Sequence, residues 1–382
     1  MTAGVRPGAV AGGAVALGLV LAVAAAGPAS AEIGGWQLEA VKAPEAQEVT
    51  TGEGVVVAVL DTGVGEHPDL DGKVLDGKSF VDGDPRRDQD GHGTDMAAQV
   101  LSVAPDAKIL PVQVTSGGDG FSFGAAVEGI RWAVDNGAQV INISLAGSAA
   151  TDDAINAISY ALDHEVPVIA GTGNDPSAEV GSPAYLPGVV AVSGFDESGE
   201  VWDEATTGPE TDLSAPAANI QGVIPDGPGT DAGYRDGGSG TSIATALTSG
   251  VAALVRAKFP DASAADVVNR LITTAEDAGA PGRDDQFGYG KVDAYAAVTA
   301  DVPPVEANPL GDPAEELSGT EAASDASEGG LTPAMLLAAV GGGVVLLAVV
   351  VIVAVMLGRR KKNRTPPPGP YTYPPPPPPP AR

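Results

Sequence analysis

The chain of 382 residues contains no cysteine, and this absence excludes several kinds of chemistry at once. There is no disulfide framework, no thiol nucleophile and no cysteine-ligated metal, so an exported domain would have to rest on its hydrophobic core. Basic residues are also few, since 20 Lys and Arg stand against 50 Asp and Glu, for a formal net charge of −30. Such a surface repels nucleic acid, so we expect no nucleic-acid partner, and the charge favours solubility.

Long apolar runs are scarce as well, and the two that occur lie near the ends of the chain. Residues 1–31 have the pattern of a secretory signal peptide. Residues 331–358 contain an uncharged apolar run followed by RRKKNR, which predicts a single C-terminal transmembrane helix with a basic and Pro-rich cytoplasmic tail at 359–382. The acidic segment 301–330 has too little apolar surface to fold, and we expect a disordered stalk. The folded domain at 32–300 would then lie outside the plasma membrane.

The segment between these ends alternates short apolar runs with helical patterns. Runs that are apolar on both faces are typical of parallel strands covered by helices on both sides. The pattern therefore predicts an α/β domain with a mostly parallel sheet and helices on both of its faces. The predicted strands lie in 54–63, 107–114, 139–147, 166–174 and 188–195, and the clearest predicted helices lie at 121–136 and 151–164.

Three polar residues stand where chemistry is expected in such a fold. Asp61 follows a buried strand, His92 lies between glycines at the start of a helical segment, and Ser242 lies where another apolar helix begins. Hydrolysis by a serine requires a base close to its hydroxyl and a carboxylate that orients the base. A helix N-cap is the ordinary alternative for Ser242. The other two histidines, His67 and His164, fit structural roles in a turn and at a helix C-terminus.

The combination of motifs resembles the subtilisin-like serine proteases over nearly all of 36–300. VAVLDTGV, DGHGT and GTSIAT are similar to the aspartate, histidine and serine motifs of that family, in the same order. The resemblance implies a subtilisin-like fold and a serine endopeptidase with Asp61, His92 and Ser242 as the catalytic residues. It also implies that Asn174, in GTGNDP, contributes to the oxyanion hole. No metal and no cofactor are expected.

The same resemblance places a polypeptide substrate along the segment SLAG, where it would add a strand. The residues it implies for substrate binding are Ser144, Leu145, Ala146, Gly147, Ala170, Gly171 and Gly173. Small side chains there leave space, which suggests an apolar or mid-sized side chain at the scissile position. The chain departs from the family pattern at Ala146, where glycine is usual. Asp95, one turn beyond His92, would favour the charged imidazole.

The order of segments is similar to that of the mycosins, the membrane-bound subtilases of type VII secretion. That likeness implies a membrane-anchored protease that processes exported proteins, with components of the secretion system as partners. The alternative is a scaffold that keeps the fold without activity. The presence of Asp61, His92, Asn174 and Ser242 together favours the enzyme, because a retired site would be free to lose one of them.

Overall fold

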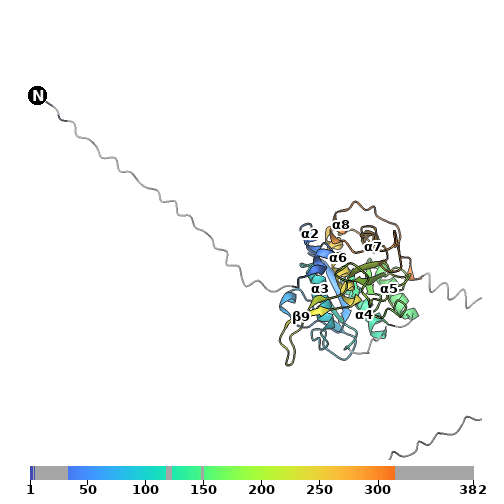
Figure 1. Ribbon diagram of the computed structural model, residues 1–382. Coiled ribbons are helices and arrows are strands. Elements are labelled where there is room, and N and C mark those ends of the chain that lie inside the picture. Colours follow the sequence, from blue (N-terminus) through green and yellow to red (C-terminus); the bar gives the residue numbers. More distant parts are fainter. Residues whose placement is uncertain (3, 5–32, 118–122, 148–149, 315–382) are drawn as a thin grey trace, which may run out of the picture. The chain divides into compact units, whose positions relative to one another are not determined.

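The computed structural model describes residues 1–2, 4, 33–117, 123–147 and 150–314 (Figure 1). Most of the expected signal peptide, the expected transmembrane helix and the cytoplasmic tail lie outside these residues. Within the described part of the chain, no helix is both long enough and apolar enough to span a bilayer.

A seven-stranded sheet forms the centre of the domain, with every neighbouring pair parallel. Its order is β2-β3-β1-β4-β5-β6-β7, so the chain winds outwards in both directions from β1. The strands are β1 (Val56–Asp61), β2 (Lys78–Ser79), β3 (Lys108–Gln113), β4 (Val140–Ile143), β5 (Val168–Gly171), β6 (Val190–Phe195) and β7 (Leu213–Pro216). All five predicted strands are present, and the prediction of an α/β domain with a mostly parallel sheet is confirmed.

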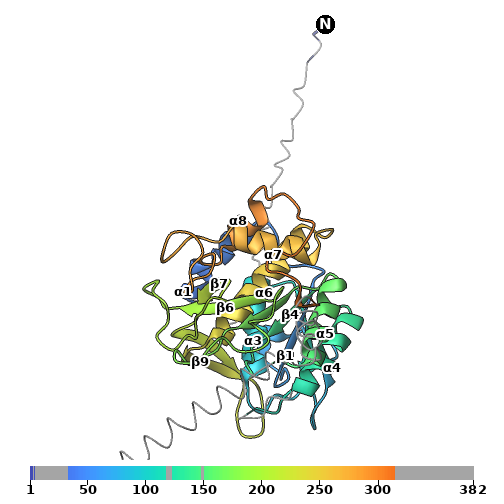
Figure 2. The same cartoon turned by 90° about the vertical axis from the view of Figure 1, so that its right-hand side faces the viewer.

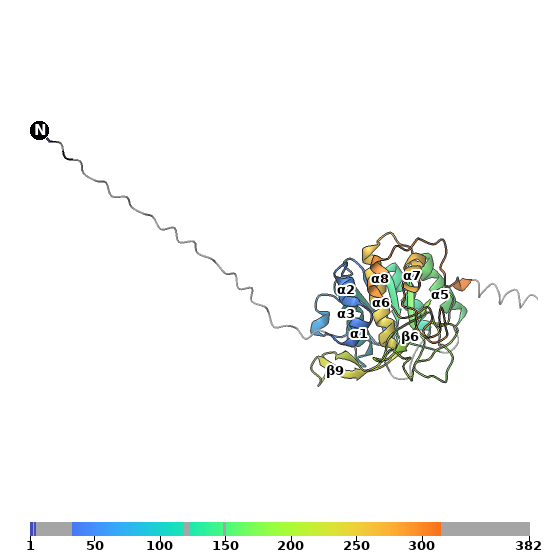
Figure 3. The ribbon, with the colours of Figure 1, turned by 45° about the horizontal axis from the view of Figure 1, so that its top comes forward.

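Helices cover both faces of this sheet because its strands are apolar on both faces. In β1, Val57 and Val59 belong to one hydrophobic cluster, whereas Ala58 and Leu60 belong to the other. Helices α3 and α6 contribute to the first cluster, and α4 and α5 to the second (Figures 2 and 3). The helices are α1 (Trp36–Ala40), α2 (Ala43–Gln47), α3 (His92–Val103), α4 (Phe123–Asp135), α5 (Asp152–Asp163), α6 (Thr241–Lys258), α7 (Ala264–Thr273) and α8 (Ala294–Thr299), with a 3₁₀ turn at Pro68–Leu70.

The topology brings distant residues to one edge of the sheet. Strands β1, β4 and β5 are neighbours, and their carboxyl ends lead directly to Asp61, Ser144 and Asn174. In open parallel sheets this edge is where ligands bind. The fold therefore gathers polar side chains that lie up to 113 positions apart in the sequence.

A second, two-stranded antiparallel sheet was not predicted. It consists of β8 (Ile220–Ile224) and β9 (Gly233–Gly238). The sequence GYRDGG of β9 has no apolar alternation, so no pattern of the strand type identifies it. The sheet packs beside α3, to which Arg235 connects it through Asp95.

The expected stalk differs from the structure at its start. Residues 301–314 run along the domain, where the Arg270 side chain donates to carbonyl oxygens of the chain just before and within this segment. The Val305 amide donates to Asp266, and the Leu310 carbonyl accepts from the Gly188 amide. These contacts are hydrogen bonds to distant parts of the chain. They hold residues 301–314 against the domain although this segment has few apolar residues. The rest of 301–330 lies outside the described residues.

Candidate active site

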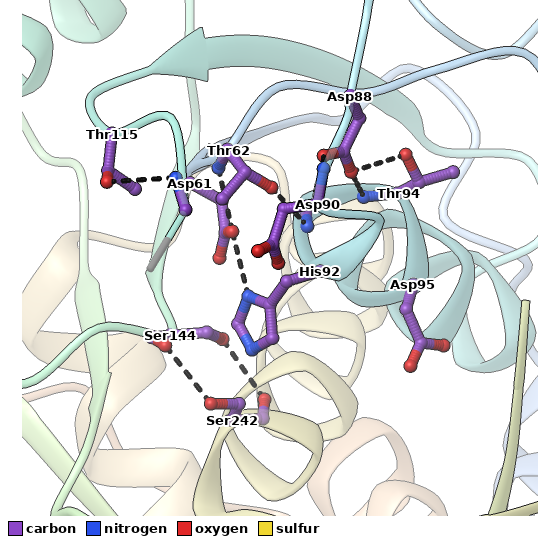
Figure 4. Close-up of polar contacts among 12 residues, drawn as sticks. Asp61, Thr62, Asp88, Asp90, His92, Thr94, Asp95, Thr115, Ser144 and Ser242 are labelled. Atoms are coloured by element: carbon purple, nitrogen blue, oxygen red, sulfur yellow. Dashed lines mark hydrogen bonds and ion pairs between the residues drawn. The ribbon is translucent and has the colours of Figure 1, made fainter. Parts of the chain in front are cut away.

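Asp61 and His92 meet at the carboxyl end of β1. Asp61 is fully buried as the last residue of that strand, and its Oδ1 lies 2.8 Å from Nδ1 of His92 (Figure 4). The Thr62 amide donates a second hydrogen bond to the same oxygen at 2.7 Å. A buried carboxylate in this position holds the imidazole with its Nδ1–H toward Asp61, so that in the neutral ring Nε2 is the proton acceptor.

The start of α3, which carries His92, is held by a carboxylate outside the helix. Asp88 accepts from the Gly91 amide at 2.8 Å and from both the amide and the hydroxyl of Thr94 at 2.8 and 2.7 Å. These bonds satisfy donors that a helix N-terminus otherwise leaves open. At Gly93, an added Cβ would lie 2.2 Å from the carbonyl oxygen of Gly63, so only glycine lets α3 approach the end of β1 this closely.

Ser242 is the second residue of α6, and it is not the N-cap. The N-cap is Gly240, so the alternative assignment of Ser242 as a capping residue is wrong. Its hydroxyl instead donates to the Ser144 carbonyl at 3.1 Å, while the Ser144 hydroxyl donates to the Ser242 carbonyl at 3.0 Å. In Figure 4 the Nε2 edge of the His92 ring faces the Ser242 side chain. A turn of the hydroxyl away from Ser144 would direct its proton to that nitrogen.

Asn174 supplies the cap that Ser242 does not. Its Oδ1 accepts from the Thr241 amide at 2.8 Å and from the Thr241 hydroxyl at 3.0 Å. The amide oxygen is therefore committed to the first residue of α6, and the Nδ2 donor is turned the other way. Asn174 is exposed and lines the same cleft as Ser242. The side chain thus offers an N–H donor beside the serine at a positive helix end.

The pKa of His92 is raised from 6.5 to about 9. Burial of the ring lowers it, but the charge of Asp61 and its hydrogen bond act in the opposite direction and are reinforced by the charges of Asp95 and Asp90. The side chain of His92 remains 29% exposed, so it stays accessible from the cleft. The expectation that Asp95 favours the charged imidazole is confirmed in direction.

Asp95 is itself buried and has a partner from the second sheet. Its Oδ2 lies 2.7 Å from Nη2 of Arg235, and its Oδ1 accepts from the Val223 amide at 3.1 Å. An added Cβ at Gly222 would lie 2.6 Å from this carboxylate, so the strand passes directly over it. The cation and the amide compensate the buried charge, which would otherwise be costly.

A cleft of about 470 Å³ lies in front of these residues. Five of the residues expected to bind substrate line it, namely Ser144, Leu145, Ala146, Gly171 and Gly173. Two others do not. Ala170 is fully buried within β5, and the backbone of Gly147 is paired with Ser182 through two hydrogen bonds of 2.9 and 3.1 Å.

The cleft also has walls that the sequence reasoning missed. They are Thr62, Asp90, Thr115, Gly117 and Thr241. Asp90 and Thr62 stand within two residues of His92 and Asp61, and this closeness in sequence is the signal that could have identified them. Thr115 and Gly117 follow β3, whose carboxyl end reaches the same edge of the sheet.

The remaining histidines have structural contacts. Nδ1 of His67 accepts from the Asp69 amide at 3.2 Å, and Nε2 lies 3.1 Å from the Gly233 carbonyl. Nδ1 of His164 lies 2.8 Å from the Tyr160 carbonyl at the end of α5. Both were expected to be structural, and neither lines the cleft. Across the described ranges, no three acidic or histidine side chains converge as the ligands of a metal ion would.

Comparisons with known proteins identify the family of the chain. The model of the subtilase family matches residues 52–290 of the chain. Among curated proteins, alkaline elastase YaB of Bacillus sp. (strain YaB) is 36% identical over 273 residues, which is 69% of this chain and 69% of that protein. Subtilisin Savinase of Lederbergia lenta is 35% identical over 69% of this chain and 97% of its own length.

Solved structures that are similar to this chain belong to the same family and include MycP proteases. MycP1 with its N-terminal propeptide removed is 31% identical with a TM-score of 0.63, over 71% of this chain and 98% of that one. The MycP3 protease of the type VII (ESX-3) secretion system is 30% identical with a TM-score of 0.63, over 72% and 90% of the two chains. The chain belongs to the subtilase family and is a serine endopeptidase that acts on polypeptides.

Proposed function

We propose that Asp61, His92 and Ser242 form the catalytic triad and that Asn174 contributes to the oxyanion hole. The observation that carries the proposal is the 2.8 Å contact between Asp61 and Nδ1 of His92, with the opposite edge of the ring facing Ser242 (Figure 4). Its further support is the order of the three motifs within the region that the subtilase family matches.

In the first step, neutral His92 accepts the proton of the Ser242 hydroxyl through Nε2 as Oγ attacks the carbonyl carbon of the peptide bond. Asp61 stays ionised and stabilises the imidazolium that forms. The new C–O bond converts the carbonyl oxygen into an oxyanion. The backbone N–H of Ser242 and Nδ2 of Asn174 are the donors available to it, at the N-terminal end of α6.

In the second step, His92 returns the proton to the leaving nitrogen, the C–N bond breaks, and an ester remains on Ser242. Water then attacks that ester with His92 again as the base, which releases the acid product and restores the serine hydroxyl. The side chain at the scissile position would enter the space between 144–146 and 171–173. Small and apolar walls there suit an apolar or mid-sized side chain.

The experiment is active-site labelling of the full-length protein with a fluorophosphonate. We expect the wild type and Ser177→Ala to be labelled and Ser242→Ala to be unlabelled, because Ser177 is an exposed serine outside the cleft. Labelling of Ser242→Ala at the wild-type level would remove Ser242 from the proposal. An unlabelled wild type that retains its fold would mean that these residues do not form a working triad.

We also propose that the domain is exported and stays tethered to the plasma membrane by residues 331–358. The support is the apolar run with its basic flank, which lies outside the described residues, and the type VII secretion proteases among the similar structures. On this proposal, exported proteins of a type VII-like system are the substrates. Fractionation of cells is the test: the full chain should sediment with membranes and a chain ending at 330 should be released. Release of both would contradict the anchor.

A further inference from the structure

Arg235 lies outside the cleft and forms an ion pair with a buried residue of the helix that carries His92. Its Nη2 lies 2.7 Å from Oδ2 of Asp95, which follows His92 by one turn of α3 (Figure 4). The Asp95 side chain is fully buried, whereas the Arg235 side chain is 48% exposed. Arg235 is not one of the described residues that line the cleft. Any effect of Arg235 on the site must therefore pass through Asp95 or act over a distance.

Contacts on either side of Arg235 hold the second sheet against α3. The hydroxyl of Tyr234, the preceding residue of β9, donates to Oδ1 of Asp69 at 2.7 Å. The side chain of Gln99, in the next turn of α3, donates to the Gln221 carbonyl of β8 at 2.9 Å. Because both strands are tied down close to the guanidinium, the sheet delivers this cation to one place on α3.

Negative groups predominate around the start of α3. Besides His92, the titratable side chains of α3, of residues 88–91 and of the elements packed against this end of the helix are Asp61, His67, Asp69, Asp88, Asp90, Asp95, Arg235 and Asp236. Strand β8 and the first half of α6 add no charged residue. Across the described ranges, Arg235 is the one lysine or arginine that forms an ion pair with any of these carboxylates. Burial lowers the pKa of His92, but the charges of Asp61, Asp95 and Asp90 raise it by more.

We propose that Arg235 is a positioning residue of the active site, which binds Asp95 and neutralises the buried negative charge next to His92. The proposal rests on the proposed role of His92 as the base, because a base must be neutral before it accepts a proton. A lone buried carboxylate one turn away would favour the charged ring. The guanidinium opposes this effect, so it keeps a larger fraction of the enzyme in the active form at neutral pH.

The experiment measures the titration of the His92 ring in the full-length protein by NMR, with ¹³C-labelled histidine. The chain contains three histidines, so the ring signals are few, and the signal lost in His92→Gln is that of His92. Arg235→Gln keeps an N–H donor for Asp95 and loses the charge. We expect it to raise the midpoint of the ring titration by about half a pH unit or more. Because the neutral fraction falls tenfold for each pH unit below the midpoint, kcat/KM at pH 7 should fall by about threefold.

Two further variants separate the charge from other effects. Arg235→Lys keeps the positive charge, so its ring midpoint should lie within about 0.2 pH unit of the wild type. Lys258→Gln removes an exposed cation at the far end of α6, about 24 Å along the helix from Ser242, and should leave the midpoint unchanged. A smaller fraction of folded enzyme lowers kcat/KM equally at every pH and moves no midpoint, so a merely structural role would not produce these results.

The dependence on Asp95 is measured with a double-mutant cycle. In Asp95→Asn there is no buried charge for Arg235 to bind, and its half-exposed side chain is screened by water and salt. Adding Arg235→Gln to Asp95→Asn should therefore move the ring midpoint by at most about 0.2 pH unit. The double variant leaves no lone buried charge, so this comparison remains decisive if Arg235→Gln alone does not fold.

Three outcomes would contradict these expectations in different ways. A ring midpoint in Arg235→Gln equal to that of the wild type overturns the role of Arg235 and leaves the proposed triad intact. An equal rise with and without the Asp95 carboxylate overturns the link through Asp95. A ring midpoint that rises while the pH dependence of kcat/KM stays as in the wild type overturns His92 as the base, and hence the proposed function, although Arg235 would still act on the ring.

Discussion

We expect kcat/KM of the protease to fall on acidification at a pH well above the one at which an ordinary histidine becomes charged. The proposed base must be neutral to accept the Ser242 proton. With the pKa of His92 raised to about 9, only about 1% of the enzyme carries a neutral imidazole at pH 7, against about three quarters for an unperturbed histidine. Raising the pH from 7 to 10 should therefore increase kcat/KM by roughly two orders of magnitude.

The assay is kcat/KM for a peptide without titratable side chains, measured from pH 5 to pH 10.5, since this constant reports the free enzyme. We expect an increase of about tenfold for each pH unit up to pH 8 and a plateau only above about pH 9. Asp95→Asn should lower the midpoint, because the charge of Asp95 raises the pKa of His92. Asp82→Asn, which lies outside the cleft, should leave it unchanged. A plateau already reached at pH 7 would refute the electrostatic argument.

The same shift has a consequence for stability. Because the pKa of His92 is higher in the folded protein than the value of 6.5 expected when unfolded, the Asp61–His92 pair stabilises the fold fully below pH 6.5. That contribution is lost as the pH rises through about 9. The pH of greatest activity and the pH of greatest stability should therefore differ, and denaturation at pH 6 and pH 10 measures the difference.

Three further substitutions test the proposed oxyanion donor, the close contact of α3 with the end of β1, and a buried carboxyl group. Asn174→Asp keeps an acceptor for the Thr241 amide but removes the Nδ2 donor, so kcat should fall by about 10²–10³ while thermal stability changes little. This magnitude is the one known for subtilisin itself. An unchanged kcat would remove Asn174 from the proposed oxyanion hole. In a urea titration, Gly93→Ala should lower the free energy of unfolding by about 1–3 kcal/mol, because the added methyl group would contact the Gly63 carbonyl. Gly227→Ala is the control: its methyl group would meet no atom within 4 Å, so the free energy of unfolding should change by no more than about 0.5 kcal/mol. Burial raises the pKa of Asp212 to about 7, so the fold favours the protonated side chain. The stability that this group contributes is fully present below about pH 4 and is lost as the pH rises to 7. Asp212→Asn should then gain up to about 4 kcal/mol over the wild type at pH 8 and little at pH 4, and an equal gain at both would show that burial of the charge is not the cause.

Much of the fold follows from local patterns in the sequence. Strand β1 is apolar at every position before Asp61, so it had to be covered on both faces, and the same holds for β5. Strands β4 and β6 are apolar except for Asn142 and Ser193, and they too are buried on both faces. Parallel strands of this kind direct their carboxyl ends to one edge, which is why Asp61 and Asn174 could be expected close together. The start of α3 at His92 follows from the glycines on either side of it.

The features that escaped prediction depend on contacts between distant parts of the chain. Asp95 reads as an ordinary polar residue in the first turn of a helix, and only the passage of β8 and β9 over it makes it a buried ion-pair partner of Arg235. Likewise, Ala170 and Gly171 are adjacent small residues, but the alternation of β5 buries the first in the core and turns the second to the cleft. The spacing of residues in the sequence does not show which face of β5 packs in the core and which faces the cleft. The neighbouring strands and helices decide that.

The cap of α6 illustrates how structure and proposed chemistry depend on one another. A serine that caps its own helix has its oxygen occupied by backbone amides. Here the Thr241 amide is satisfied by Asn174, from the segment after β5, and the hydroxyl of Ser242 donates to the Ser144 carbonyl on the side of the cleft where His92 lies. The contact with Thr241 commits Oδ1 of Asn174 to the start of α6 and leaves Nδ2 as the donor that the proposed oxyanion role requires. One hydrogen bond between residues 67 positions apart thus holds both the proposed nucleophile and the proposed oxyanion donor, and neither arrangement could be inferred from the serine motif alone.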